Sequence, residues 1–322
     1  ILVCLVGSEM CIRDRVRDSL VDWRELILGD QSSLILDKYH PYEDLPKMIN
    51  PTSGYIFNTN NSPFNSTAEF ENLKEEDYNS TFSFMEEENN RSVRFMELID
   101  EYEKLSYEDF KEIKYDQQYP DSILYIGNIS QIFDLDKSEF PNYENLIDLI
   151  QNWDRRGDIE NIGAAQWSLY YSYMLDVLSE NDLNVKDTID IKFHLDALEK
   201  TKARLMNNFG KLDIRLGDIQ RLVRGDKSLP VSGLIDMIAP TYSVPMEGGK
   251  VRAVSGESYI MLIKYSEDGP EVETVLPYGN SSNPSSPHYT DQIKMYTEKK
   301  LKIMTLDKDE ILSRAVRIYS PN

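Results

Sequence analysis

Apolar residues recur at helical spacing through the middle of the chain, beginning near Asn90. In the segment RSVRFMELIDEY, Val93, Met96 and Ile99 fall on one face of a helix. The same period continues through SYEDFKEIKYDQ, NYENLIDLIQNW, GAAQWSLYYSYMLDVLSE and KFHLDALEKTKARLMNNFG. The pattern therefore predicts a series of helices over residues 90–210.

Local signals mark where two of these helices begin and end. Ser106 is followed three residues later by Asp109, a spacing that resembles a capping box at a helix start. Gly210 follows the last periodic segment, where glycine commonly ends a helix. These signals support a helical assignment for the middle of the chain.

Strand-like patterns lie on both sides of the helical middle. The segment GYIFNTN, at 54–60, is rich in aromatic and β-branched residues. After about residue 240, the short runs GKVRAV, SYIMLIKY and EVETVLPYG are separated by Gly, Asp and Pro, as in antiparallel meanders. A final helix is predicted at 287–300, in PHYTDQIKMYTEKK. The fold class predicted is α+β, with antiparallel strands at both ends and a helical middle.

Two stretches lack a regular pattern. Pro41 and Pro46 restrict the region before residue 51 to extended and turn conformations. Positions 61–90 are polar, acidic and rich in asparagine, which predicts an exposed loop with little regular structure.

Composition narrows the classes of partner. The 322 residues are 40% hydrophobic, enough for one large domain or two modest ones, and the formal net charge is −21. This acidic excess argues against a nucleic-acid or anionic-membrane partner, because phosphates would be repelled. No apolar stretch approaches the roughly 20 residues that cross a bilayer, so no membrane-spanning segment is predicted.

The first fifteen residues differ from the rest. Both cysteines, Cys4 and Cys11, lie there, which excludes a disulfide framework or a thiolate metal site from the remaining chain. The opening ILVCLVGSEMCIRDR resembles the translated read-through of a sequencing adapter. We therefore expect residues 1–15 to be non-native and residues 16–322 to be the protein proper.

Familiar catalytic patterns are scarce. His40, His194 and His288 show no HxxxH or HExxH spacing, and structural roles are expected for all three. The sequence contains no GxSxG elbow and no phosphate-binding loop. The glycines of MEGGKV predict a turn, and WDRRGD predicts an Asp–Arg pair at a helix end.

Five segments in a fixed order carry a family resemblance. They are NPTSGYIFNTNNSPF, NNRSVRFMELID, NWDRRGD, RLGDIQRLVRGDKSLPVSG and YGNSSNPSSPHYTDQIKMYTEKK. Together they resemble the C-terminal part of the β-chain in the penicillin acylase family of N-terminal nucleophile hydrolases, from about residue 16 to 320. The resemblance implies an αββα sandwich, in which helix layers flank two stacked antiparallel sheets. The segment at 54–60 and the strands within 240–322 would belong to those sheets, and residues 90–210 would be a helical elaboration.

The resemblance also implies a reaction. Family precursors are cut autocatalytically, which exposes a Ser at the head of the β-chain. This Ser attacks an amide carbonyl while its own α-amino group, which titrates near 8, serves as the base. That Ser is not in this chain, so the chain alone is expected to be inactive. A Thr or Cys nucleophile, or an acidic scaffold domain that keeps the fold without catalysis, are the alternatives.

Two residues match family positions with catalytic roles. From composition alone, Asn60 would be a turn residue and Arg91 a solvated helix residue. The family motif places an asparagine two residues after another, here Asn58 and Asn60, and the side-chain amide of the second donates to the oxyanion. Arg91 matches an arginine on the following helix. Its implied role is to hold Asn60 and bias the charge near the nucleophile, because its guanidinium stays protonated.

Other family features are not given catalytic roles here. Ser286, His288 and Asp291 lie in a segment typical of the family and are expected to form a structural loop. Members often bind calcium through carboxylates that lie mostly upstream; the spacing of Glu69 and Glu71 fits poorly, so no metal ligand is assigned. No cofactor is expected to be required.

The resemblance implies partners and a location as well. The expected substrate is an N-acylated small molecule such as an acyl-homoserine lactone, a lipopeptide or a β-lactam, with the late segments closer to acylases of the first two. The expected protein partners are the upstream part of the β-chain and the α-chain of the same precursor. Export to the periplasm or beyond is expected.

Overall fold

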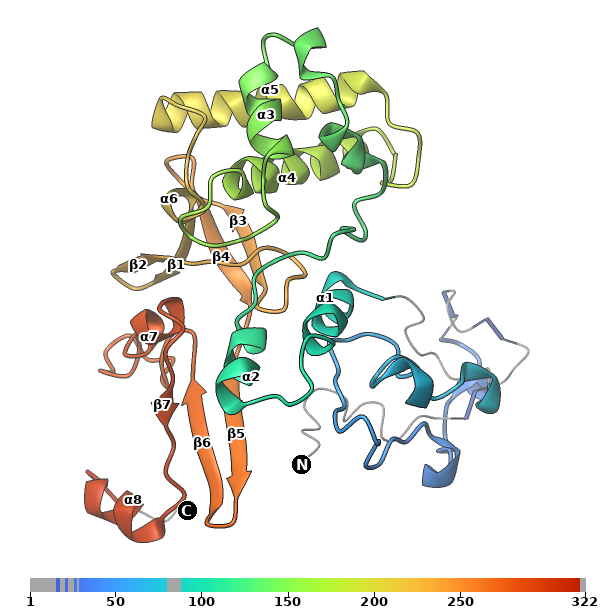
Figure 1. Ribbon diagram of the computed structural model, residues 1–322, viewed down its shortest axis with the longest axis vertical. Coiled ribbons are helices and arrows are strands. Elements are labelled where there is room, and N and C mark those ends of the chain that lie inside the picture. The colour runs from blue at the N-terminus through green and yellow to red at the C-terminus, as the bar shows by residue number, and fades with distance from the viewer. Residues whose placement is uncertain (1–15, 18–20, 23–25, 28, 80–87, 319–322) are drawn as a thin grey trace. The chain divides into compact units, whose positions relative to one another are not determined.

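The computed structural model describes residues 16–17, 21–22, 26–27, 29–79 and 88–318 (Figure 1). The segment at 1–15, which we expect to be non-native, lies outside these ranges. The chain divides into two compact units, Ile1–Ser92 and Val93–Asn322, and each is described by itself.

The first unit is built mainly from loops. Its described regular elements are the 3-10 helices η1 (Ser32–Leu34), η2 (Tyr42–Asp44), η3 (Glu69–Glu71) and η4 (Glu75–Asp77), and the start of α1 (Asn90–Ile99). The prediction of an irregular 61–90 segment is confirmed for its described part. Several of its polar side chains are nevertheless buried, among them Asn61 and Thr67.

The predicted strand at 54–60 is wrong for this structure. Gly54 and Asn60, at its two ends, have left-handed φ values of +81° and +66°, and the segment forms no ladder with any described strand. The segment is instead held by separate bonds: Phe57 N donates to Ser66 O at 2.9 Å, and Thr67 Oγ1 donates to Tyr55 O at 2.8 Å. High β-propensity alone therefore does not make a strand here, because a strand also needs a partner.

The helical middle is confirmed. Its elements are α1, α2 (Tyr107–Lys114), η5 (Gly127–Phe133), η6 (Lys137–Glu139), α3 (Glu144–Gln151), α4 (Ala164–Glu180), α5 (Ile191–Phe209) and α6 (Leu216–Ile219). The capping box forms as predicted: Asp109 N donates to Ser106 Oγ at 3.1 Å and Ser106 N donates to Asp109 Oδ2 at 2.9 Å. Gly210 ends α5 with φ +72°, in the left-handed region that glycine favours.

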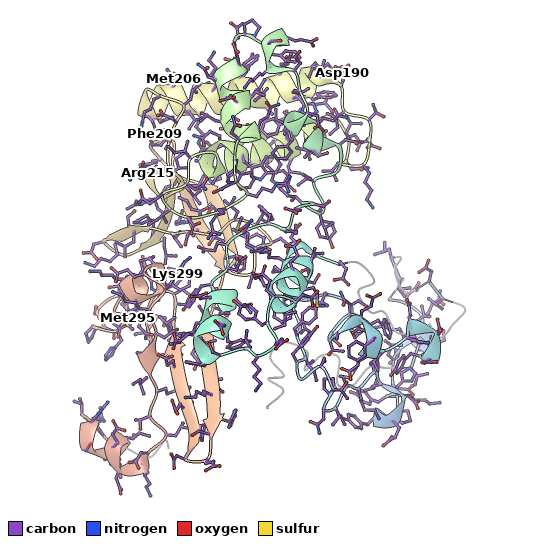
Figure 2. The ribbon with its side chains drawn as sticks, in the orientation of Figure 1. Asp190, Met206, Phe209, Arg215, Met295 and Lys299 are labelled. Atoms are coloured by element: carbon purple, nitrogen blue, oxygen red, sulfur yellow. The ribbon has the colours of Figure 1, made fainter. Side chains whose placement is uncertain are left out.

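The largest buried cluster of the second unit is formed by η5, α3, α4 and α5, of which α4 and α5 run side by side (Figure 1). Asp190 and Met206 mark opposite ends of α5 in Figure 2, where side chains fill the space toward α4. The rings of Trp153 and Trp167 stack with their centres 5.6 Å apart. The largest fully buried side chains are mostly aliphatic: Ile129, Ile132, Leu146, Ile147, Ile150, Met174, Leu178, Leu198, Leu205, Leu216 and Ile219, with Tyr170.

Two sheets follow the helices. The first has the order β2-β1-β4-β3, from β1 (Gln220–Arg224), β2 (Lys227–Pro230), β3 (Thr241–Pro245) and β4 (Val251–Gly256). Its β1 and β4 are parallel, which differs from the purely antiparallel arrangement we expected. The second has the order β5-β6-β7, all antiparallel, from β5 (Ile260–Ser266), β6 (Gly269–Val275) and β7 (Lys302–Ile303).

Two further differences concern the C-terminal third. The β1–β2 hairpin was not predicted; it turns at Gly225, whose φ of +59° suits the first position of a two-residue turn. The predicted helix at 287–300 reduces to α7 (Ile293–Thr297), because the residues before it form a loop, and α8 (Lys308–Arg314) follows β7. The α+β class is confirmed. No helix in the described ranges has both the length and the hydropathy needed to span a bilayer.

Candidate functional site

Asn60 has an unusual backbone conformation. Its φ is +66°, in the left-handed region that asparagine tolerates better than most residues. The backbone N–H of Asn60 donates to Asn58 Oδ1 at 2.8 Å, so the side chain two residues earlier stabilises the turn. The side chain of Asn60 is exposed. The paired asparagines of the motif thus have separate tasks, since Asn58 holds the backbone and Asn60 presents its amide.

Arg91 contacts that amide. Its Nη1 donates to Asn60 Oδ1 at 3.0 Å. A guanidinium has only donors, so the amide atom facing it must be the carbonyl oxygen. The NH2 group of Asn60 is therefore the end of the amide that Arg91 does not contact, and its hydrogens are available to an acceptor. The orientation of Asn60 follows from the chemistry of its partner.

Two neighbouring side chains fix the residue that precedes Asn60. Asn61 Oδ1 accepts from both Thr59 N and Thr59 Oγ1, each at 2.9 Å. Asn89 Nδ2 donates to Thr59 O at 3.0 Å. Asn61 and Asn89 are buried, with 7% and 5% of their surfaces exposed. The peptide groups on both sides of Thr59 are consequently held by buried amides.

Asn89 also begins helix α1. Its Oδ1 accepts from Ser92 N at 2.9 Å, and Asn89 N donates to Ser92 Oγ at 3.1 Å, which is a reciprocal cap. Arg91 therefore lies in the first turn of α1, where the helix dipole adds positive potential to that of the guanidinium. An amide donor beside such potential can stabilise an oxyanion.

Glu71 has a structural task near the start of the same segment. Its carboxylate accepts from Thr52 N at 2.5 Å and from Ser53 N at 2.9 Å, and the Thr52 hydroxyl also donates to it. The hydrogen bond from the Thr52 side chain is the largest cause that lowers the pKa of Glu71 to about 2. Both oxygens are thus engaged.

Within the described ranges, no three His, Cys, Asp or Glu side chains lie close enough together to hold a metal ion.

The segment containing Ser286, His288 and Asp291 closes on itself. His288 Nδ1 lies 2.8 Å from Asp291 Oδ2, whereas the Ser286 hydroxyl accepts from the backbone N of His288 at 3.2 Å. Although the segment contains Ser, His and Asp, the Ser286 hydroxyl faces a peptide N–H rather than the imidazole. This geometry is that of a loop, not of a nucleophile and its base.

Arg224 holds the same loop. Its guanidinium lies 4.7 Å from the ring centre of Tyr278 and 4.3 Å from that of Tyr289, and Nη2 donates to Ser281 O at 2.8 Å. Two cation–π contacts and a hydrogen bond therefore fasten both ends and the interior of the loop to β1.

The other histidines and charged motifs have local partners. His194 is fully buried on α5, and its Nδ1 lies 2.6 Å from Tyr170 Oη; burial lowers the pKa of His194 to about 4. His40 Nδ1 lies 3.9 Å from Asp44. In WDRRGD, Arg156 Nε donates to Asp158 at 2.8 Å, so the predicted Asp–Arg pair forms, but it lies in the loop that follows α3 (Glu144–Gln151) rather than at a helix end.

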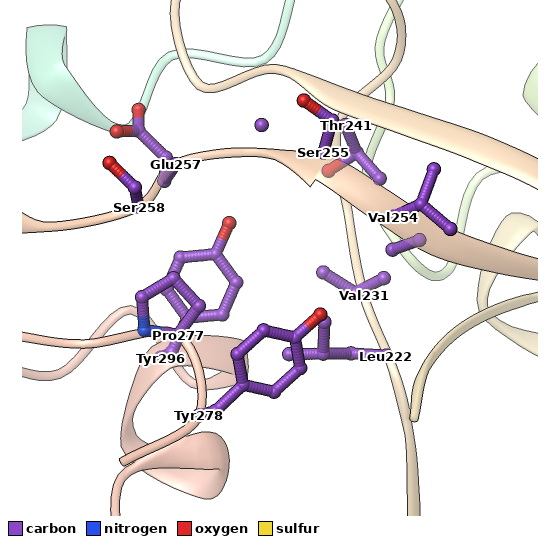
Figure 3. Close-up of a pocket in the computed structure, with 12 residues that line it drawn as sticks. Leu222, Val231, Thr241, Val254, Ser255, Glu257, Ser258, Pro277, Tyr278 and Tyr296 are labelled. Atoms are coloured by element: carbon purple, nitrogen blue, oxygen red, sulfur yellow. The ribbon is translucent and has the colours of Figure 1, made fainter. Parts of the chain in front are cut away.

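A cavity of about 330 Å³ lies wholly within the second unit (Figure 3). Its lining combines apolar groups from β1 and β4 with the rings of Tyr278 and Tyr296. The carboxylate at its edge, Glu257, is paired with Lys114. The cavity thus combines apolar surface with hydroxyl-bearing residues, the two tyrosines and Thr241, Ser255 and Ser258 (Figure 3).

The sequence pointed to Asn60 and Arg91, which the structure brings together, but not to the residues that brace them. The sequence indicated no role for Thr59, Asn61 or Asn89. One local signal was available for Asn89: an asparagine followed three residues later by Ser92, immediately before apolar periodicity, is typical of a helix N-cap. The link from Asn89 to Thr59 joins positions 30 residues apart and has no such signal.

Comparison with known proteins places the chain in a family. The penicillin amidase family model matches residues 13–313, and the chain therefore belongs to that family. The chain is 31% identical over 102 residues to an acyl-homoserine lactone acylase, PvdQ, of Pseudomonas fluorescens, a match covering 31% of this chain and 13% of that protein.

Two further relatives are also named as acylases. PvdQ of Pseudomonas syringae pv. tomato is 25% identical over 180 residues, covering 50% of this chain and 23% of the relative. Aculeacin-A acylase of Actinoplanes utahensis is 29% identical over 94 residues, covering 26% and 11%. The matched region is therefore less than a quarter of each of these relatives. A solved penicillin G acylase of Alcaligenes faecalis aligns with a TM-score of 0.49 and 13% identity, covering 97% of this chain and 64% of that one.

Proposed function

We propose that this chain is part of an acylase, an amide hydrolase that removes the acyl group from an N-acylated small molecule. The observation that carries the proposal is the hydrogen bond from Arg91 to Asn60 Oδ1. In this account Asn60 Nδ2 donates to the oxyanion of the tetrahedral intermediate, and Arg91 orients Asn60. The nucleophile is an N-terminal Ser, outside this chain, which autocatalytic cleavage of a precursor exposes.

The geometry suits that role in two respects. An amide NH2 is neutral and always protonated, so it can donate at any pH at which the nucleophile works. Its carbonyl end is held by a guanidinium that cannot lose its proton near neutrality, so the amide needs little reorganisation when charge develops. A single donor of this kind typically contributes about 10²–10³ in rate.

The relatives suggest the class of substrate. Two of those named above are described as acyl-homoserine lactone acylases and one as an aculeacin-A acylase. We therefore propose an acyl-homoserine lactone or a lipopeptide as substrate ahead of a β-lactam. The proposal also includes the upstream part of the β-chain and the α-chain as partners, and a periplasmic or secreted location.

The test is to read the source DNA upstream of Val16 and express the complete reading frame. We expect an open frame that contains a Gly–Ser junction at the head of a strand, and a product that cleaves itself there. The purified protein should release homoserine lactone from an acyl-homoserine lactone, and replacement of the exposed Ser by Ala should abolish release. A stop codon followed by a start close to Val16 would contradict the proposal and favour an inactive acidic scaffold domain.

A further inference from the structure

The side chain of Asn89 joins two parts of the first unit that carry the proposed site. On one side, its Oδ1 accepts from Ser92 N at 2.9 Å and so caps helix α1. On the other side, its Nδ2 donates to Thr59 O at 3.0 Å. Only 5% of the Asn89 surface is exposed, so water competes weakly for these bonds. The Thr59 hydroxyl also donates to Asn89 Oδ1 at 3.3 Å, so both ends of this amide contact the segment at 54–60, and only its NH2 group donates to that segment.

Thr59 and Ser92, the two residues that the Asn89 side chain binds, are each next in sequence to a proposed site residue. Thr59 immediately precedes Asn60, and Arg91 follows Asn89 by two positions within the capped turn. A shift of α1 along the segment at 54–60 would therefore change the separation between the Arg91 guanidinium and Asn60 Oδ1, now 3.0 Å. The bond between Asn89 and Thr59 opposes that shift.

We infer that Asn89 is a positioning residue for the acylase reaction, which sets the register between α1 and Asn60. This inference rests on the proposed function. The Arg91 side chain is long and the Asn60 side chain is exposed, so the hydrogen bond between them does not by itself fix the rotamer of either. A catalytic donor must be held to within about 0.5 Å, and residues fixed by buried hydrogen bonds achieve this better than exposed pairs. Asn89 supplies such a buried link.

The two functions of the Asn89 amide can be separated by substitution. In Asn89→Asp, a carboxylate oxygen still caps Ser92 N, because aspartate is as good an N-cap as asparagine. The other carboxylate oxygen replaces the NH2 group and faces the carbonyl of Thr59, so the donor to Thr59 O is lost. Asn89→Ser also keeps a capping oxygen and lacks the second arm. Both variants keep the helix start and remove the donor to Thr59 O, although Asn89→Asp keeps the oxygen that accepts from the Thr59 hydroxyl at 3.3 Å.

The experiment measures kcat and KM for acyl-homoserine lactone hydrolysis by the complete, self-cleaved protein. Misplacement by about 1 Å can cost on the order of 10²-fold in rate, so Asn89→Asp should lower kcat by roughly 10- to 100-fold while KM stays within about twofold. Self-cleavage should be retained, and the melting temperature should fall by only a few degrees, because one part-buried carbonyl loses its donor. Asn208→Asp is the matched control: its amide donates within its own helix, to Arg204 O at 2.8 Å, and kcat should not change.

A second arm separates failure of this inference from failure of the proposed function. If Asn89 acts through Asn60, Asn89→Asp should cause no further loss of kcat in an Asn60→Ala background. Full kcat in Asn89→Asp, or an undiminished loss in the Asn60→Ala background, would overturn the positioning role. Loss of folding in both Asn89→Asp and Asn89→Ser would also overturn it, in favour of a purely structural cap. An unchanged kcat in Asn60→Ala alone would instead overturn the proposed function.

Discussion

Arg91 Nη1 donates to Asn60 Oδ1 across 3.0 Å, and this bond determines which end of the Asn60 amide is engaged. Because the guanidinium can only donate, the carbonyl end is occupied and the NH2 end is the one presented. The same backbone carries a left-handed φ at Asn60, a conformation that costs energy and persists where neighbours hold it. The neighbours here are asparagine and threonine side chains rather than apolar packing.

The contribution of Arg91 should be partial. Arg91→Ala removes the donor to Asn60 Oδ1 but leaves the NH2 group in place, so kcat/KM of the complete enzyme should fall by about 10-fold, the size expected when one charge-assisted hydrogen bond is lost. Arg314→Ala, which removes another helical arginine that pairs with Glu310, should leave kcat/KM unchanged. A rate in Arg91→Ala equal to that of the parent would return Arg91 to an ordinary first-turn residue.

His194 should make the helical unit sensitive to acid. Burial lowers its pKa to about 4, whereas the unfolded chain titrates near 6.5. Between these values the unfolded state binds more protons than the folded state, so stability is full above about pH 6.5 and falls as the pH drops toward 4. The slope contributed by His194 is at most about 1.4 kcal/mol per pH unit.

The measurement is urea unfolding at pH 7, 5.5 and 4.5. The pair His194→Leu with Tyr170→Phe removes the titrating group and its hydroxyl partner together, so no buried polar atom of the pair is left unpaired. This double variant should lose less stability between pH 7 and 4.5 than the parent. An identical pH dependence in both proteins would show that His194 does not titrate in this window.

Arg224 should fasten the loop that contains Tyr278, Ser281 and Tyr289. Arg224→Leu removes two cation–π contacts and the bond to Ser281 O, which predicts a loss of roughly 1–3 kcal/mol in unfolding free energy. Limited proteolysis should then cut within this loop first. Arg224→Lys keeps the charge but lacks the planar guanidinium, so its unfolding free energy should lie between those of the parent and Arg224→Leu. Unchanged protease resistance in Arg224→Leu would mean that other contacts hold the loop.

The helices could be predicted from sequence because their signals are local. Apolar period, the Ser106–Asp109 box and Gly210 all act within one or two turns. The strands were harder. The β1–β2 hairpin has a charged, partly exposed sequence, and β1 finds β4 across a parallel pairing that no neighbouring residue encodes. The segment at 54–60 shows the converse, since its propensity favours a strand but no described strand pairs with it.

The candidate site also has some residues that the sequence could indicate and others that it could not. Asn60 and Arg91 could be singled out only through a family motif, since each alone has the composition of a turn or a solvated helix. The bracing of Thr59 by Asn89 is a contact between positions 30 residues apart, formed by polar side chains that lack any periodic pattern. Such contacts depend on the folded path of the chain, and the structure was needed to find them.

The most direct test of the central claim replaces Asn60 in the complete, self-cleaved enzyme. Asn60→Asp keeps the size and the backbone preference of asparagine but cannot donate, and Asn60→Ala removes the amide altogether. The measurement is kcat for release of homoserine lactone, with self-cleavage and melting temperature as folding controls. The account predicts a loss of about 10²–10³-fold or more in kcat for both variants, with intact processing. Near-normal turnover in either variant would contradict the assignment of Asn60 as the oxyanion donor.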